Sequence, residues 1–256
     1  MRAQIGLATA VVALAACAPA APAQEQATLV VRHTHYFVIV NDADDAPTIS
    51  VQSRQYYRKP YPLELLLVDD EGQARLEMAL PIGTEMSQQI PGAAAPFYLL
   101  VARPGSNGTV FDVDRPWAIA CGGGNRNLGS NQQVPQMHLY VPTECESLEV
   151  FIQAYSPNEG ARVTLLDPDG NEALLLDGEF DAAETRNVPV PADMRGRVWS
   201  LTWAKPQTVD ANLDDVNVAI NGYLAPLLWK ERQWAERYGP LMWERHKPYI
   251  RAVAGP

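Results

Sequence analysis

Apolar and polar residues alternate with a period of two over much of this chain. The segment 199–203 reads Trp-Ser-Leu-Thr-Trp, and residues 28–40 are rich in valine, tyrosine, phenylalanine and isoleucine. Such alternation is typical of a β-strand with one face in the core and the other in water. Because little helical periodicity occurs before residue 222, the pattern predicts an all-β protein built from antiparallel sheets.

Two turn-forming segments separate pairs of predicted strands. Residues 69–73 read Asp-Asp-Glu-Gly-Gln, and residues 167–171 read Asp-Pro-Asp-Gly-Asn. The glycine in each segment permits the positive φ that a tight hairpin turn requires. Both segments therefore predict β-hairpins.

The chain also repeats itself with a shift of roughly one hundred residues, a period that indicates duplicated domains rather than a solenoid. Four segments recur in order, and the first match aligns His35 with His138. The matches are 35–38 with 138–141, 49–52 with 150–153, 66–73 with 164–171, and 97–104 with 199–206. We predict two tandem antiparallel β-sandwich domains of jelly-roll type, at 27–119 and 134–222, joined by a linker loop at 120–133.

Only the end of the chain, residues 223–256, has a helical pattern. A helix is predicted at 228–238, and Gly239 and Pro240 are expected to end it and to start a second, shorter helix. The aromatic residues of this tail either pack back on the sandwiches or form an interface with a partner protein. These residues are Trp229, Trp234, Tyr238 and Trp243.

The first residues predict export. Arg2 precedes an apolar run at 5–16, which is too short to span a bilayer and is typical of a signal peptide. Leu-Ala-Ala-Cys at 14–17 is similar to a lipobox, after which Cys17 would be lipidated, whereas Ala-Pro-Ala at 21–23 is similar to an ordinary cleavage site. With either site, residues 1–23 are signal peptide and tether. The protein is expected in the bacterial cell envelope, as an outer-membrane lipoprotein or as a periplasmic or secreted protein.

The net charge limits the expected partners, and the two cysteines of the exported part predict a disulfide. The formal net charge is −10, which argues against nucleic acid and leaves a lipid anchor as the only expected link to a membrane. Export would leave Cys121 and Cys145 in an oxidising compartment, where two thiols usually pair. A disulfide between them is predicted, and two unpaired buried thiols are the alternative.

Several runs in the second half of the chain carry a family resemblance. They lie at 138–142, 148–151, 163–170, 196–201 and 213–216. Together they resemble the jelly-roll and pre-peptidase C-terminal-like β-sandwich modules of secreted bacterial proteins. The resemblance implies a sandwich fold that binds glycan or acts as a spacer. The expected partner of this chain is a glycan or an envelope protein. It carries no site residue, since these runs mark turns and core.

Residues 56–61, Tyr-Tyr-Arg-Lys-Pro-Tyr, are the best candidates for a binding site. Aromatic rings pack on the C–H faces of sugars, and arginine or lysine pairs with uronate or sulfate groups. The alternative is that the tyrosines cover the edge of the core. The candidate ligand-binding residues are Tyr56, Tyr57, Arg58, Lys59, Tyr61 and, near the predicted domain junction, Trp117.

Two patterns suggest metal ligands. Asp167, Asp169 and Asn171 have the alternating oxygen spacing that calcium favours, although the segment lacks the glycine and the final glutamate of an EF-hand loop. His33 and His35 would share one face of a strand and could supply two zinc ligands. A structural role is the simpler interpretation of both patterns, so no cofactor is expected, with calcium as the alternative.

Motifs of the common hydrolases, metalloproteases, NTPases and dehydrogenases are missing from the sequence. We therefore predict an exported non-catalytic binding protein whose ligand is a glycan. One alternative is an assembly subunit that docks a partner through its C-terminal helices. Another is a polysaccharide hydrolase or lyase, because a pair of catalytic carboxylates has no sequence signature.

Overall fold

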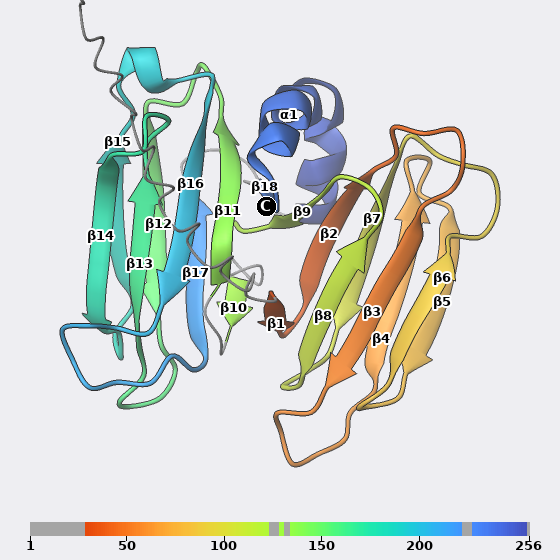
Figure 1. Cartoon of the computed structure of the whole chain (residues 1–256), viewed down its shortest axis with the longest axis horizontal. Coiled ribbons are helices and arrows are strands. Elements are labelled where there is room, and N and C mark those ends of the chain that lie inside the picture. The colour runs from red at the N-terminus through yellow and green to blue at the C-terminus, as the bar shows by residue number, and fades with distance from the viewer. Residues whose placement is uncertain (1–28, 123–127, 131–133, 222–226, 255–256) are drawn as a thin grey trace, which may run out of the picture.

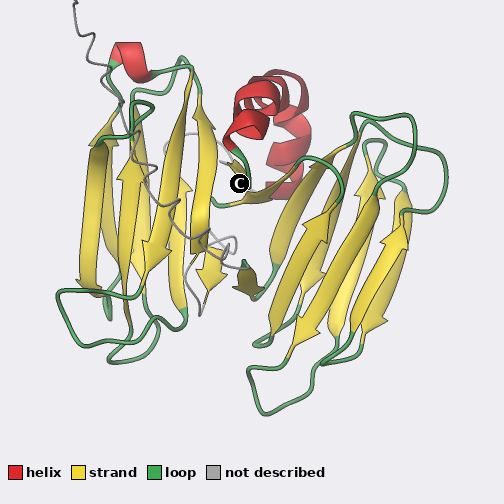
Figure 2. Cartoon of the chain, viewed as in Figure 1, coloured by secondary structure: helices red, strands yellow, loops and turns green. Residues whose placement is uncertain are grey.

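The computed structural model describes residues 29–122, 128–130, 134–221 and 227–254. The chain is mostly β, with antiparallel sheets and one C-terminal helix, as the period of two predicts (Figure 1, Figure 2). No helix in these ranges is long and apolar enough to cross a membrane.

The first half of the chain contributes strands β1 to β9. They are β1 (Val30–Arg32), β2 (His35–Val40), β3 (Thr48–Arg54), β4 (Leu63–Asp69), β5 (Ala74–Leu80), β6 (Glu85–Gln89), β7 (Phe97–Arg103), β8 (Gly108–Val113) and β9 (Trp117–Ala120).

The second half contributes strands β10 to β18 and the helices. They are β10 (Leu128–Ser130), β11 (Val134–Val141), β12 (Ser147–Gln153), β13 (Gly160–Leu166), β14 (Glu172–Glu179), β15 (Glu184–Pro189), the 3₁₀ turn η1 (Ala192–Met194), β16 (Arg197–Ala204), β17 (Val216–Asn221), β18 (Leu227–Trp229) and α1 (Arg232–Ala254). Both predicted hairpins form, as β4–β5 and β13–β14.

These strands form two sheets, and each sheet runs through both halves of the chain. The eight-stranded sheet has the order β15-β12-β17-β10-β1-β8-β3-β6, and the ten-stranded sheet has the order β14-β13-β16-β11-β18-β9-β2-β7-β4-β5. Two antiparallel strand pairs, β1–β10 and β9–β18, join the halves. The predicted division into separate domains therefore stays a prediction, because hydrogen-bonded sheets cross the boundary.

Both halves nevertheless repeat one strand order. In the eight-stranded sheet β6-β3-β8-β1 corresponds to β15-β12-β17-β10, and in the ten-stranded sheet β5-β4-β7-β2-β9 corresponds to β14-β13-β16-β11-β18. Each strand of the first half thus has a counterpart nine strands later. The predicted linker at 120–133 also contains a strand, since β10 pairs with β1 and β17.

Side chains from the inner faces of both sheets fill one continuous core. Leu63, Leu65 and Leu67 of β4 point inward, as do Val163 and Leu165 of its counterpart β13. Burying such aliphatic side chains is the main force that holds the two layers together. The alternating strands therefore place their exposed members on the outer faces, where a ligand could reach them.

The predicted match of His35 with His138 is wrong by three residues, because the strand register makes Phe37 the counterpart of Met137 and Val38 the counterpart of His138. His35 is buried on the inner face of β2 together with Phe37 and Ile39. In β11 the inward positions are Met137 and Leu139, so His138 lies on the outer face. Because side chains alternate between faces, a shift by an odd number of residues exchanges core and surface positions.

The C-terminal tail also differs from the prediction of two helices. Leu227–Trp229 forms strand β18, and one helix, α1, continues through Gly239 and Pro240. This helix covers the outer face of the ten-stranded sheet where the two halves meet (Figure 1). Gly239 lies directly on Tyr140 of β11, so packing outweighs the local helix-breaking tendency of these residues.

Replacing Gly239 by alanine is expected to lower the free energy of unfolding by about 1–3 kcal/mol, the usual cost of overpacking. A Cβ atom at this position would lie 2.9 Å from Cγ of Tyr140 and closer still to its Cβ. Urea denaturation measures the effect. Gly178→Ala is the matched control because no atom lies within 4 Å of the added Cβ. Equal stability of the two variants would contradict the close approach of α1 to β11.

Candidate functional site

The loop between β3 and β4, residues 55–62, exposes three aromatic rings and is named the tyrosine loop below. Tyr56, Tyr57 and Tyr61 are 36%, 46% and 47% exposed, respectively. Arg58 and Lys59 lie between them and are exposed as well. The structure thus brings together all the predicted ligand-binding residues of this segment on one surface loop.

A buried asparagine fixes the backbone of the tyrosine loop. The Asn107 side chain has no exposed area, and its Oδ1 accepts hydrogen bonds from the backbone N–H groups of Tyr56 (3.1 Å) and Tyr57 (3.0 Å). Its Nδ2 donates to the backbone oxygens of Lys59 (3.1 Å) and Tyr61 (3.5 Å). One amide therefore satisfies four backbone groups of the loop, which holds the exposed rings in place without covering them.

Gly108 in β8 leaves room for the ring of Tyr56, and Gly105 provides the turn that precedes Asn107. A Cβ atom at Gly108 would lie 2.8 Å from Cδ2 of Tyr56, and one at Gly105 would lie 3.9 Å from Cδ2 of Tyr61. The backbone of Gly105 has φ of +61°, a conformation that favours glycine. These positions let the loop lie close against the turn that carries Asn107.

Asn107 was not recognised in the sequence as part of a binding site. An Asn-Gly pair indicates a turn, but nothing in the local pattern shows that the side chain points away from water towards another loop. The turn joins β7 to β8, far along the chain from residues 55–62. Only the pairing of β3 with β8, which aligns Arg54 with Gly108, brings the two segments together.

The corresponding loop of the second half, residues 154–159, carries one exposed ring. Tyr155 is 61% exposed, and the loop contains no lysine or arginine. Its backbone is held differently, because Asn212 bonds through its backbone to Asn158 and Gly160. The duplicated fold therefore presents the aromatic and cationic cluster in one half only.

Trp117 is not part of this surface, contrary to the prediction. Its side chain is 2% exposed and lies edge-on to Phe37 and Phe111 in the core. The indole Nε1 donates a hydrogen bond to Asp112 at 3.2 Å. A neighbouring proline suggested a junction loop, but the residue opens strand β9, where its ring faces inward.

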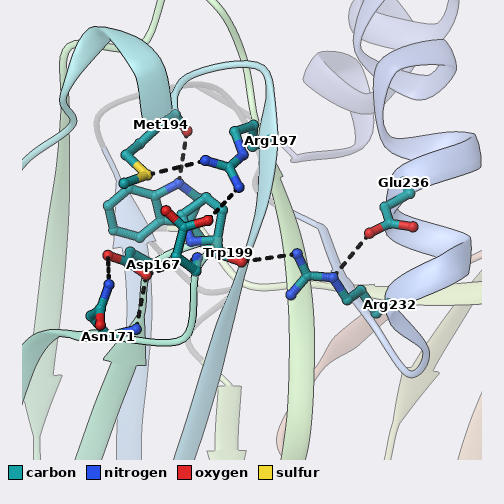
Figure 3. A network of polar contacts seen from close by, with 9 residues as sticks. Asp167, Asn171, Met194, Arg197, Trp199, Arg232 and Glu236 are labelled. Carbon is teal, nitrogen blue, oxygen red and sulfur yellow. Dashed lines mark hydrogen bonds and ion pairs between the residues drawn. The ribbon is translucent and has the colours of Figure 1, made fainter.

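The predicted calcium ligands form a hairpin turn whose carboxylate already has donors. Oδ1 of Asp167 accepts the backbone N–H groups of Asp169 and Asn171, both at 2.9 Å, and its Oδ2 accepts from Nδ2 of Asn171 at 3.0 Å (Figure 3). Asp69 makes the same two backbone bonds in the first hairpin. This shared arrangement explains the recurring aspartate as a turn residue.

The remaining polar groups of that turn bond to strand β16 and to the C-terminal helix. Asp169 is ion-paired with Arg197 at 2.5 Å, and Arg232 of α1 donates to the backbone oxygen of Pro168 at 3.1 Å (Figure 3). Arg232 also pairs with Glu236. Within the described residues, no three histidine, cysteine, aspartate or glutamate side chains are grouped to hold a metal ion.

The predicted disulfide between Cys121 and Cys145 is not formed. The Cys121 thiol donates to the backbone oxygen of Val218 at 3.3 Å, and the Cys145 thiol donates to that of Ser147 at 3.2 Å. Burial raises the pKa of Cys145. Both residues lie in the core, so the structure corresponds to the alternative of two buried thiols.

His33 and His35 were predicted to share one face of a strand, but they do not. His33 has φ of +67° in the turn between β1 and β2, whereas His35 is buried in β2. Nε2 of His35 lies 2.6 Å from the backbone oxygen of Arg32. Burial lowers the pKa of His35 to about 4, which fits a neutral structural histidine.

The aromatic residues of the tail belong to the ten-stranded sheet or pack on it, which is the packing-back alternative. Trp229 is fully buried and stacks on Tyr238, with ring centroids 6.0 Å apart. The Tyr238 hydroxyl donates to Asp42 at 2.5 Å, and Trp243 donates to Glu144 at 2.6 Å. Trp234 packs partly buried against the same cluster. These contacts occupy the surface that the interface prediction requires.

A depression of about 280 Å³ lies on the outer face of the eight-stranded sheet. Its acidic lining residues are Glu85 and Asp112. The Asp112 carboxylate accepts from the Trp117 indole and is ion-paired with Lys230 at 3.1 Å. This pairing favours a structural role for Asp112 over that of a catalytic carboxylate.

The predicted lipidation site, Cys17, lies outside the described residues, as does the rest of the predicted signal peptide. Comparison with protein-family models gives no match, and comparison with curated proteins gives none either.

Proposed function

We propose that this protein is an exported, non-catalytic binding protein of the bacterial cell envelope that holds a glycan on its tyrosine loop. The observation that carries the proposal is the group of three exposed tyrosines on a backbone fixed by buried Asn107. Large exposed rings on a fixed loop lose little conformational entropy on binding, which favours affinity. Export is supported by the apolar run at 5–16 and the cleavage sites that follow it.

The fold supports this proposal by separating the loop from the core. The tyrosine loop connects a strand of one sheet to a strand of the other, so both of its ends are anchored in the sandwich. Loops on a rigid β-scaffold commonly carry binding residues. Tyr56 lies over Gly108 while a third of its surface stays exposed, an arrangement that suits contact with the flat face of a sugar ring.

Replacing both Tyr57 and Tyr61 by alanine is expected to weaken glycan binding by about tenfold or more, since truncating an anchoring aromatic residue commonly costs 1 kcal/mol or more. Affinity gel electrophoresis with a panel of neutral and anionic polysaccharides measures retardation of the full chain. Tyr155→Ala is the matched control, because this exposed tyrosine lies on the corresponding loop of the other half. If no polysaccharide retards the unmodified protein, the proposal is wrong.

A further inference from the structure

Most cations of this acidic protein are engaged in ion pairs with aspartate or glutamate. Among the lysine and arginine side chains that the structure describes, pairs form throughout both halves. The exceptions within this described set are Arg54, Arg58, Lys59 and Arg103. Among the described side chains, these residues are therefore the positive charges that no carboxylate pairs with.

All of these exceptions surround the tyrosine loop. Arg54 is the last residue of β3, immediately before the loop, and its Nε donates to Gln52 at 2.8 Å. Arg58 and Lys59 lie between the tyrosines. Arg103 ends β7, just before the turn that carries Asn107, and Glu64 is its cross-strand neighbour.

The other half of the chain shows that the fold does not require these charges. Gln153 ends β12, where the first half has Arg54 at the end of β3. The loop 154–159 contains Glu159 and no cation. Lys205, which follows β16 as the counterpart of β7, is ion-paired with Asp210 at 3.8 Å. Uncompensated positive charge thus accompanies the tyrosines and is absent from their counterpart loop.

We infer that the ligand of the tyrosine loop is an anionic polysaccharide, one that carries uronate or sulfate groups. This inference rests on the proposed function and names its ligand class. The tyrosine rings contact the sugar faces, while Arg58 and Lys59 form charge-assisted hydrogen bonds with the acidic groups. A local positive potential on a protein of formal net charge −10 also orients the approach of such a ligand.

Biolayer interferometry with the full chain tests the inference on three immobilised probes: polygalacturonate, dextran sulfate and unmodified dextran. The double variant Arg58→Gln/Lys59→Gln is expected to bind whichever anionic probe the unmodified protein binds, but at least tenfold more weakly. The control, Arg186→Gln/Lys205→Gln, removes the same charge from exposed pairs in the other half and is expected to change binding less than twofold. The two anionic probes distinguish carboxylate from sulfate recognition.

The outcomes distinguish failure of the anionic ligand class from failure of the proposed glycan binding. Tyrosine-dependent binding of dextran that both charge variants retain would overturn the anionic class and leave glycan binding intact. Failure of all polysaccharides to bind would remove both. Phosphatidylglycerol vesicles serve as a further probe. If the protein binds them as strongly as it binds the anionic polysaccharides, and the Tyr57→Ala/Tyr61→Ala variant binds them without loss, a membrane-surface role replaces the inference.

Discussion

Replacing Asn107 by alanine is expected to abolish glycan binding and to lower the free energy of unfolding by about 2–4 kcal/mol. The side chain makes four hydrogen bonds to the backbone of the tyrosine loop from a fully buried position. Each buried polar group that loses its partner costs about 1–3 kcal/mol, reduced where water reaches the exposed loop. Without these bonds the loop would no longer hold its rings in one arrangement.

Chemical denaturation measures the loss of stability, and gel retardation measures binding well below the unfolding temperature of the variant. Asn187→Ala is the control, because Asn187 is an exposed asparagine on the edge strand β15. A folded Asn107→Ala variant that still binds glycan normally would show that the fixed backbone is not what makes the loop a site. Normal stability together with lost binding would show that these hydrogen bonds position the rings without contributing to stability.

The alternation of apolar and polar residues was sufficient to predict the sheets because a half-buried strand imposes a period of two on its own sequence. It predicted the β13–β14 hairpin and the buried positions of Trp199 and Trp203. The repeated aspartates at 69 and 167 were also aligned correctly, since both close the same turn. Features of this kind depend only on residues that are close together in the sequence, so the sequence pattern predicts them.

Features that depend on distant pairing could not be predicted in this way. β10 contains only Leu-Gly-Ser and becomes a strand because β1 and β17 lie on either side of it. Gly239 and Pro240 locally favour the end of a helix, yet α1 continues because its inner face packs on β11 and β18. In such segments tertiary contacts override local propensity.

In the candidate site, too, residues with local chemistry could be predicted and residues that depend on distant pairing could not. Exposed tyrosines and cations in one short segment were recognisable because their chemistry is local. Asn107 was not, because its role depends on the β3–β8 pairing. Trp117 was misplaced since the sequence does not show which face of the short strand β9 points inward.

Stability is expected to fall as the pH drops from about 6.5 to 4, mainly because His35 is buried as the neutral form. Burial lowers the folded-state pKa of His35 from 6.5 to about 4, and nearby His33 adds to this effect. The unfolded chain therefore binds a proton in this window that the folded chain does not. The contribution of His35 to the free energy of unfolding is fully present above pH 6.5 and decreases by about 3 kcal/mol towards pH 4.

The hydrogen bond of His35 explains why protonation is unfavourable. A backbone oxygen can only accept, so Nε2 donates to that of Arg32, and Nδ1 is buried with no hydrogen-bond partner in the part of the chain that the structure describes. Adding a proton to Nδ1 would place a charge in the core, where burial penalises the charged form. Burial also lowers the pKa of His138 to about 4, with Arg232 contributing, so this second histidine adds to the acid loss.

Urea denaturation of the unmodified protein and of His35→Gln at several pH values between 4 and 7 separates these contributions. Glutamine can still donate to the Arg32 oxygen but does not titrate, so the variant should lose about 3 kcal/mol less than the unmodified protein over this window. Burial alone would raise the pKa of Asp69 and Asp167, but hydrogen bonds from backbone N–H groups and from the side chains of Arg75 and Asn171 outweigh it and lower both pKa values. These carboxylates therefore lose their contribution only below the window. Identical pH dependence in the two proteins would show that His35 is not buried in its neutral form.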